Sequence, residues 1–139
     1  MKKVILKAEN LHYSYTKEHE VLKGVSLDIY EGERLAILGA NGSGKSTFFL
    51  NINGVLKPES GAVYYRDKLI NKSSIKELRK NVGIVFQDAD NQIIASTVRA
   101  EVSFGPMNLG LSKDEVTKRV QDSLNYMGIS HLIDKPPHY

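Results

Sequence analysis

The clearest chemistry in the sequence lies at residues 39–47. They read Gly39-Ala40-Asn41-Gly42-Ser43-Gly44-Lys45-Ser46-Thr47, which matches the pattern G-x-x-x-x-G-K-S/T of a phosphate-binding loop at every position. Glycines let the backbone turn so that successive N–H groups surround an anion, and Lys45 adds a full positive charge. The sequence therefore predicts a site for the phosphates of a nucleotide.

Two hydroxyl groups complete this prediction. We expect the hydroxyl of Ser46 to ligate Mg²⁺, a hard ion that prefers oxygen, and that of Thr47 to hydrogen-bond the α-phosphate. The loop alone does not name the nucleoside or the reaction, because kinases, GTPases and motor ATPases all use it.

Flanking residues supply the context that such a loop needs. The apolar run Leu35–Leu38 predicts a strand buried on both faces, and Phe48, Phe49 and Ile52 predict a helix after the loop. The positive end of that helix dipole would point at the same anion.

The remaining elements predict an α/β fold. An antiparallel meander is expected first, and a second buried strand, Val82–Phe86, is expected before Gln87 and Asp88. Further strands are expected at residues 4–8, 11–15 and 21–29, and a hairpin at 62–70. Three helices are expected: one from after Ser74 through Lys80, one from after Thr97 to Phe104, and one from after Ser112 to Met127.

Composition limits the possible classes of protein. The 139 residues fit one domain or part of one, and the net charge of +3 is too small to indicate a nucleic-acid partner. The absence of cysteine excludes disulfides and thiolate metal sites. With no apolar run near the ~20 residues of a membrane span, any membrane role is expected to be peripheral.

In this order of motifs the sequence resembles the ATP-binding-cassette (ABC) family over essentially all of its length. The resemblance implies a P-loop NTPase fold of ABC type, with an N-terminal antiparallel β-subdomain, an incomplete parallel core sheet and the start of a helical subdomain. It also implies that ATP is the nucleotide and that Tyr15, in Leu11-His12-Tyr13-Ser14-Tyr15, stacks on adenine, as a flat aromatic ring can.

Gln87 matches the glutamine of the family's Q-loop, which implies a contact with Mg²⁺ and the attacking water and a link to the membrane partner. With Lys45, it is the residue to which the resemblance gives a catalytic role. The residues alone leave a second interpretation open, in which Val82–Phe86 is a strand that ends in a magnesium-binding Asp88.

Downstream motifs are similar to the energy-coupling-factor and cobalt-import ATPases within this family. The resemblance implies an importer subunit that couples ATP hydrolysis to uptake of cobalt, nickel or a vitamin. Implied partners are a second, identical or paralogous ATPase, a transmembrane coupling protein and a substrate-binding membrane subunit, which would place the chain peripherally on the cytoplasmic side of the cell membrane. The motifs are Asn91-Gln92-Ile93, Thr97-Val98, Glu101–Pro106, Asn108–Leu111 and Pro136–Tyr139.

One departure from the family concerns extent. Its signature motif, Walker-B aspartate, catalytic glutamate and switch histidine are missing, so residues 1–139 are expected to be the N-terminal part of one nucleotide-binding domain that binds ATP better than it hydrolyses it. Two alternatives stay open: a soluble P-loop NTPase that uses Asp88, and a nucleotide-binding module that does not hydrolyse.

Overall fold

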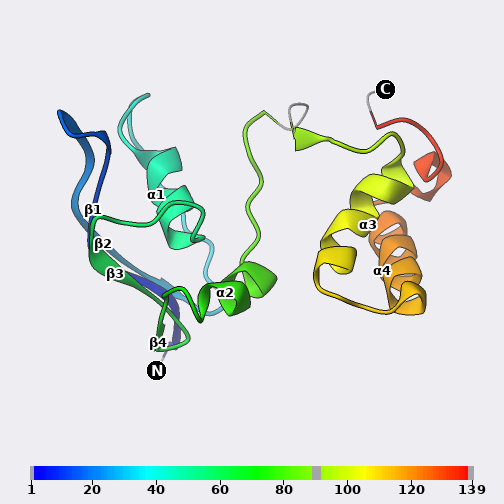
Figure 1. The fold of residues 1–139 in the computed structure, drawn as a ribbon, viewed down its shortest axis with the longest axis horizontal. Coiled ribbons are helices and arrows are strands. Elements are labelled where there is room, and N and C mark those ends of the chain that lie inside the picture. Colours follow the sequence, from blue (N-terminus) through cyan, green and yellow to red (C-terminus); the bar gives the residue numbers. More distant parts are fainter. Residues whose placement is uncertain (1, 89–91, 138–139) are drawn as a thin grey trace. The chain divides into compact units, whose positions relative to one another are not determined.

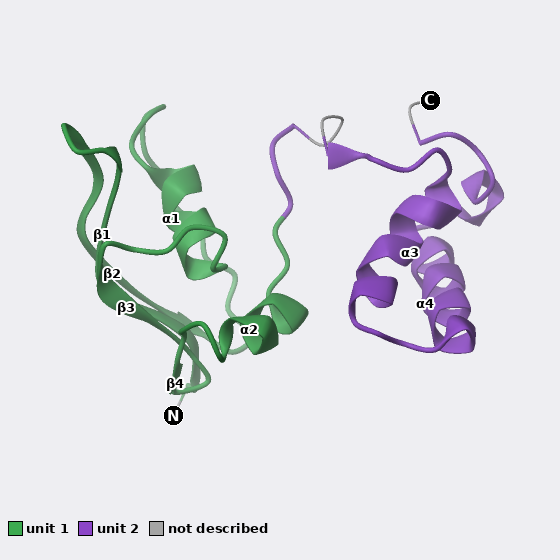
Figure 2. Cartoon of the chain, viewed as in Figure 1, with its two compact units in different colours: residues 1–84 green, residues 85–139 purple. Residues whose placement is uncertain are grey.

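The computed structural model describes residues 2–88 and 92–137. The chain divides into two compact units, Met1–Ile84 and Val85–Tyr139, drawn in green and purple in Figure 2. Each unit is described by itself.

Unit 1 is built on an antiparallel sheet. Its strands are β1 (Val4–Thr16), β2 (His19–Tyr30), β3 (Ser60–Tyr65) and β4 (Lys68–Leu69), in the order β2-β1-β3-β4 (Figure 1). The long β1 pairs with β2 on one side and β3 on the other, and a two-residue turn joins β3 to β4. The predicted meander and hairpin are both confirmed.

Two helices belong to the same unit: α1 (Lys45–Ile52) and α2 (Ile75–Asn81). Phe48 and Ile52 of α1, with Leu78 of α2, join the apolar face of the sheet in one core. Leu6, Ala8, Leu11, Leu22, Val63 and Tyr65 are its buried sheet residues. The helix predicted after Ser74 is confirmed, but the Ser74 side chain does not cap it; its hydroxyl donates to the Leu69 carbonyl at 2.9 Å.

The two strands predicted for a parallel core are not present. Residues 35–38 and 82–86 form no helix or strand among the described residues. Leu38 and Val85 are 92% and 96% exposed, whereas Ile37 and Val82 are partly buried against the core of unit 1. A parallel strand gains its hydrogen bonds only from a neighbour that a long crossover brings alongside. Within the described residues neither segment has such a neighbour, so an apolar sequence alone did not make it a strand.

Unit 2 is helical. It holds α3 (Val98–Asn108), α4 (Lys113–Tyr126) and the short 3₁₀ helix η2 (Ser130–Leu132). The two predicted helix starts are confirmed: Thr97 accepts a hydrogen bond from the N–H of Ala100, and Ser112 accepts one from the N–H of Glu115. The first helix continues past the predicted Phe104 to Asn108, through Pro106.

Helix α4 packs through two apolar side chains one turn apart. Val120 and Leu124 are buried, whereas Met127, just past the helix, is 68% exposed. Backbone bonds from Val98 to Lys135 and from Arg99 to Ile133 tie the start of α3 to the segment after η2. No helix of the described residues has the length and apolar character needed to cross a membrane.

Candidate functional site

The backbone of the loop at residues 39–47 depends on its glycines. Gly42 and Gly44 have φ angles of 80° and 91°, in the left-handed region that other residues adopt at a cost. At Gly44 a Cβ atom would also lie 3.1 Å from Val21 Cγ1 and 3.2 Å from the Val21 carbonyl oxygen of β2. The loop therefore needs glycine at position 44 for two independent reasons, its dihedral angle and the closeness of β2.

Lys45 places a positive charge inside the curve of the loop. Its Nζ donates to the carbonyl oxygens of Gly39 at 2.7 Å and Ala40 at 2.8 Å, with the Ser43 hydroxyl at 3.4 Å. A lysine ammonium has three protons and no lone pair. Held in this way at the centre of the loop, the ammonium is placed to meet an anion that enters it.

Helix α1 begins directly at this charge. Gly44 is its N-cap, no side chain caps it, and no acidic residue lies in its first turn. The free N–H groups and the helix dipole therefore present positive charge that no carboxylate of the turn offsets. The arrangement suits a phosphate group.

Ser46 is the residue of this turn that fits a magnesium ion. Its side chain is exposed in the first turn of α1, and a hydroxyl oxygen is the hard donor that Mg²⁺ accepts beside phosphate oxygens and water. No cluster of three or more His, Cys, Asp or Glu side chains occurs among the described residues. The roles of Ser46 and Gln87 as magnesium ligands stay predictions.

Tyr15 and Thr47, far apart in sequence, come together beside the loop. The hydroxyl of Tyr15 lies 3.2 Å from Thr47 Oγ1; Thr47 is buried, whereas Tyr15 is 59% exposed. The ring of Tyr13 contacts that of Tyr15 edge to face, at 5.1 Å between centroids and 86° between planes. The structure thus places the predicted base-stacking residue within reach of the predicted phosphate site.

A hollow of about 420 Å³ lies on the β2 side of the loop. Its apolar walls are formed by β2, by residues 35–38 and by Phe48, and the loop residues Gly39, Ser43, Gly44 and Lys45 line its other side. This hollow adjoins the segment that was predicted to be a buried strand. The hollow therefore has an apolar side and a polar side, and the polar side is formed by residues of the predicted phosphate loop.

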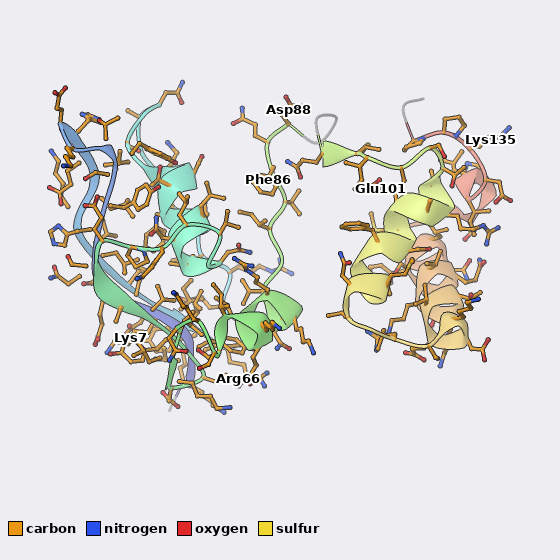
Figure 3. The ribbon with its side chains drawn as sticks, in the orientation of Figure 1. Lys7, Arg66, Phe86, Asp88, Glu101 and Lys135 are labelled. Carbon is orange, nitrogen blue, oxygen red and sulfur yellow. The ribbon has the colours of Figure 1, made fainter. Side chains whose placement is uncertain are left out.

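The second predicted catalytic residue, Gln87, belongs to unit 2. Its side chain is exposed, and it lies between Phe86 and Asp88, which are labelled in Figure 3. The carbonyl oxygen of Asp88 accepts a hydrogen bond of 3.1 Å from Gln92. The roles of Gln87 and Asp88 stay predictions, and Asn91, His138 and Tyr139 of the predicted motifs lie outside the described residues.

Glu101 has a structural role that its motif did not reveal. Its carboxylate accepts hydrogen bonds from the N–H groups of Ile94 at 3.1 Å and Ala95 at 2.8 Å. This ties the segment before α3 to the first turn of that helix. A carboxylate in a helical first turn is a common signal, but its partners, six and seven residues earlier, could not be deduced from spacing.

Comparison with known proteins gives this geometry a context. The ABC transporter family model matches residues 22–139. Two similar proteins are named energy-coupling factor transporter ATP-binding proteins: EcfA3 of Clostridium perfringens, 49% identical over 99% of this chain, and EcfA of Methanocaldococcus jannaschii, 46% identical over 97%. Each alignment covers 49% of the relative, so the chain spans about half their length.

Solved structures agree in fold. The cbiO1 protein of Clostridium perfringens, described as part of the ABC transporter complex cbiONQ, superposes with a TM-score of 0.83 at 48% identity, covering 99% of this chain and 55% of that one. The ATP-binding cassette MJ0796, in a dimeric structure bound to ADP and Pi, superposes with a TM-score of 0.79 at 28% identity, covering 96% of this chain and 62% of that one. The predicted α/β fold of ABC type is thus confirmed.

Proposed function

Because this chain belongs to the ABC transporter family, we propose that it binds ATP with Mg²⁺ at residues 39–47 and serves as the ATP-binding subunit of an energy-coupling-factor importer. The observation that carries the proposal is the Lys45 ammonium on the carbonyls of Gly39 and Ala40, at the start of a helix without acidic residues in its first turn. Such a site stabilises a polyanion through backbone dipoles and one fixed charge.

Each residue of the site has a distinct part in this proposal. Lys45 neutralises charge on the terminal phosphates, Ser46 holds Mg²⁺, and Thr47 donates to the α-phosphate. Bound Mg²⁺ would offset charge that develops on the phosphates during hydrolysis. The half-exposed ring of Tyr15 would stack on adenine, and Gln87 would orient the attacking water and respond to the γ-phosphate.

We further propose that residues 1–139 are the N-terminal part of one nucleotide-binding domain. The support is that the matched region is 49% of each relative named above and that residues 35–38 and 82–86 have the composition of core strands. In this proposal the signature and Walker-B residues come from sequence beyond the matched half, and two such domains together hydrolyse ATP.

The proposed setting is the cytoplasmic face of the cell membrane. The partners would be a second ATPase subunit, a transmembrane coupling protein and a membrane subunit that selects the cargo, a metal ion such as cobalt or nickel, or a vitamin. Support comes from the relatives, which are named transporter ATP-binding proteins, and from the similar structure, which is described as part of the cbiONQ complex.

Replacement of Lys45 by Ala tests the site directly. We expect Lys45→Ala to raise the Kd for ATP with Mg²⁺ roughly tenfold to a hundredfold, because a hydrogen bond to a charged group contributes about 1.5–3 kcal/mol. Isothermal titration calorimetry of the purified protein measures the constant. Lys76→Ala, which removes an exposed lysine from α2, is the matched control and is expected to bind like the wild type.

Equal affinity in the two lysine variants would contradict the proposed site. The transporter role needs a separate experiment, isolation of the protein from native membranes together with its partners and assay of ATP hydrolysis in that complex. A complex that binds ATP without hydrolysing it would instead support the nucleotide-binding module named above.

A further inference from the structure

The side chain of Tyr15 has two different contacts within unit 1. Its hydroxyl is 3.2 Å from Thr47 Oγ1 in the first turn of α1, and its ring meets the edge or face of Tyr13 two residues earlier on the same strand. A ring that only covered a base would need no hydroxyl partner. The hydroxyl contact reaches a residue of the phosphate loop, which suggests a second role for Tyr15.

The chemistry of Thr47 makes this contact consequential. A threonine hydroxyl has one proton to donate and two lone pairs to accept with. In a helix a threonine hydroxyl often donates its hydrogen bond to a backbone carbonyl one turn earlier. An ionised phosphate oxygen can only accept a hydrogen bond. Thr47 therefore helps to bind phosphate only when its proton points toward the loop.

A hydrogen bond donated by Tyr15 to Thr47 would have this effect. If the Tyr15 O–H donates, one lone pair of Thr47 Oγ1 is occupied and the threonine proton is free to be donated elsewhere. Thr47 is only 6% exposed, so water cannot easily replace Tyr15 as the donor. The partly buried Tyr13, packed against the core, limits the positions that the Tyr15 ring can take.

We propose that Tyr15 is a positioning residue for the phosphate loop: its hydroxyl orients Thr47 to donate to a nucleotide phosphate, while Tyr13 holds the ring in place. The inference rests on the proposed function, since it assumes that residues 39–47 bind phosphate. It adds that one side chain links the base side of the site to the phosphate side, so that phosphate affinity depends on a residue of β1.

The test separates the hydroxyl from the ring. Tyr15→Phe keeps the ring and removes the hydroxyl, and inorganic tripolyphosphate with Mg²⁺ is a probe that has phosphates but no base. Loss of one neutral hydrogen bond corresponds to roughly a threefold to tenfold change in an equilibrium constant. We expect Tyr15→Phe to weaken the binding of both ATP and tripolyphosphate by that factor. Tyr126→Phe, at a residue 91% exposed at the end of α4, is the matched control and should change the affinity for neither probe.

A double-mutant cycle with Thr47→Val shows whether the effect passes through Thr47. Once the threonine hydroxyl is gone, Tyr15→Phe should cause no further loss of tripolyphosphate affinity. A Tyr15→Phe variant equal to the wild type, or one whose loss is undiminished in the Thr47→Val background, would overturn the inference. Failure of the wild type to bind either probe would overturn the proposed function itself, and this inference with it.

Tyr13→Leu examines the other half of the inference. Leucine keeps apolar packing against the core but removes the aromatic edge from the Tyr15 ring. We expect ATP affinity to fall more than tripolyphosphate affinity, because only ATP has a base to meet the loosened ring. Equal affinity for both probes before and after the change would overturn the bracing role of Tyr13.

Discussion

The paired strands of unit 1 and the unpaired segments 35–38 and 82–86 have similar apolar character but different structures. β1, which alternates in a period of two over residues 11–15, has a partner on each side and buries Leu11 completely. Residues 35–38 are a continuous apolar run, yet Leu38 is 92% exposed. The difference teaches that apolar composition identifies a candidate strand, whereas a hydrogen-bonding neighbour decides whether it becomes one.

The reason is the distance along the chain to the neighbour. β1 and β2 are joined by a turn of two residues, so their pairing costs little loop entropy and forms locally. A parallel strand needs a crossover of a dozen residues or more. The segments at 35–38 and 82–86 depend on such distant partners, and the described residues supply none.

The largest expected effect tests this comparison at its two extremes. Leu11→Ala should lower the free energy of unfolding by roughly 2–5 kcal/mol, because it leaves a cavity in a filled core. Leu38→Ala should change it by less than about 0.5 kcal/mol, as is usual for exposed positions. Urea unfolding of both variants measures the difference, and a large cost at Leu38 would show that residues 35–38 are buried in solution.

Two glycine substitutions sharpen the comparison, one in the loop at residues 39–47 and one in the unpaired segment 82–86. Gly44→Ala should destabilise the protein by about 1–3 kcal/mol, since alanine is strained at a φ of 91° and its Cβ would approach Val21. Gly83→Ala, in the unpaired segment with nothing within 4 Å of the added Cβ, is the control. It should be neutral or stabilising, by up to about 1 kcal/mol, as thermal unfolding of both would show.

The smallest effect concerns charge on the paired sheet. The Lys7 ammonium hydrogen-bonds Glu9 on β1, which lowers the pKa of that carboxyl group and raises the pKa of the lysine. A carboxyl group whose pKa is lowered by folding stabilises the fold at any pH above its pKa in the unfolded chain, about 4.3. It loses that contribution as the pH falls through its pKa in the folded protein. The contribution of Lys7 is lost at high pH, as the pH rises above the unfolded pKa of about 10.4 and through the raised pKa of the folded protein.

Glu9→Gln removes the carboxylate and should give a slightly flatter fall of stability with pH below about 5. Unfolding curves between pH 3 and pH 7, values set by the carboxyl range, provide the measurement. Glu18→Gln in the turn between β1 and β2 controls for loss of one negative charge. Because both partners are exposed, the effect should also shrink in high salt, and an unchanged pH profile would show that the pair adds nothing to stability.

Local features were predictable from sequence because their causes are local. The meander, the 62–70 hairpin, the helix caps of Thr97 and Ser112 and the glycine loop all depend on residues close in the chain. For the same reason the pattern at 39–47 identified the loop and its lysine without any knowledge of the fold.

What the sequence determined by itself is the chemistry available: a glycine loop, a lysine, two hydroxyl groups and an aromatic ring on an early strand. Only the tertiary structure decided that the Tyr15 hydroxyl reaches Thr47, that Val21 excludes a side chain at position 44, and that residues 35–38 and 82–86 stay outside the sheet. These outcomes depend on which distant residues meet. The turns, caps and sheet register that bring them together fix that choice, and spacing along the chain does not encode it directly.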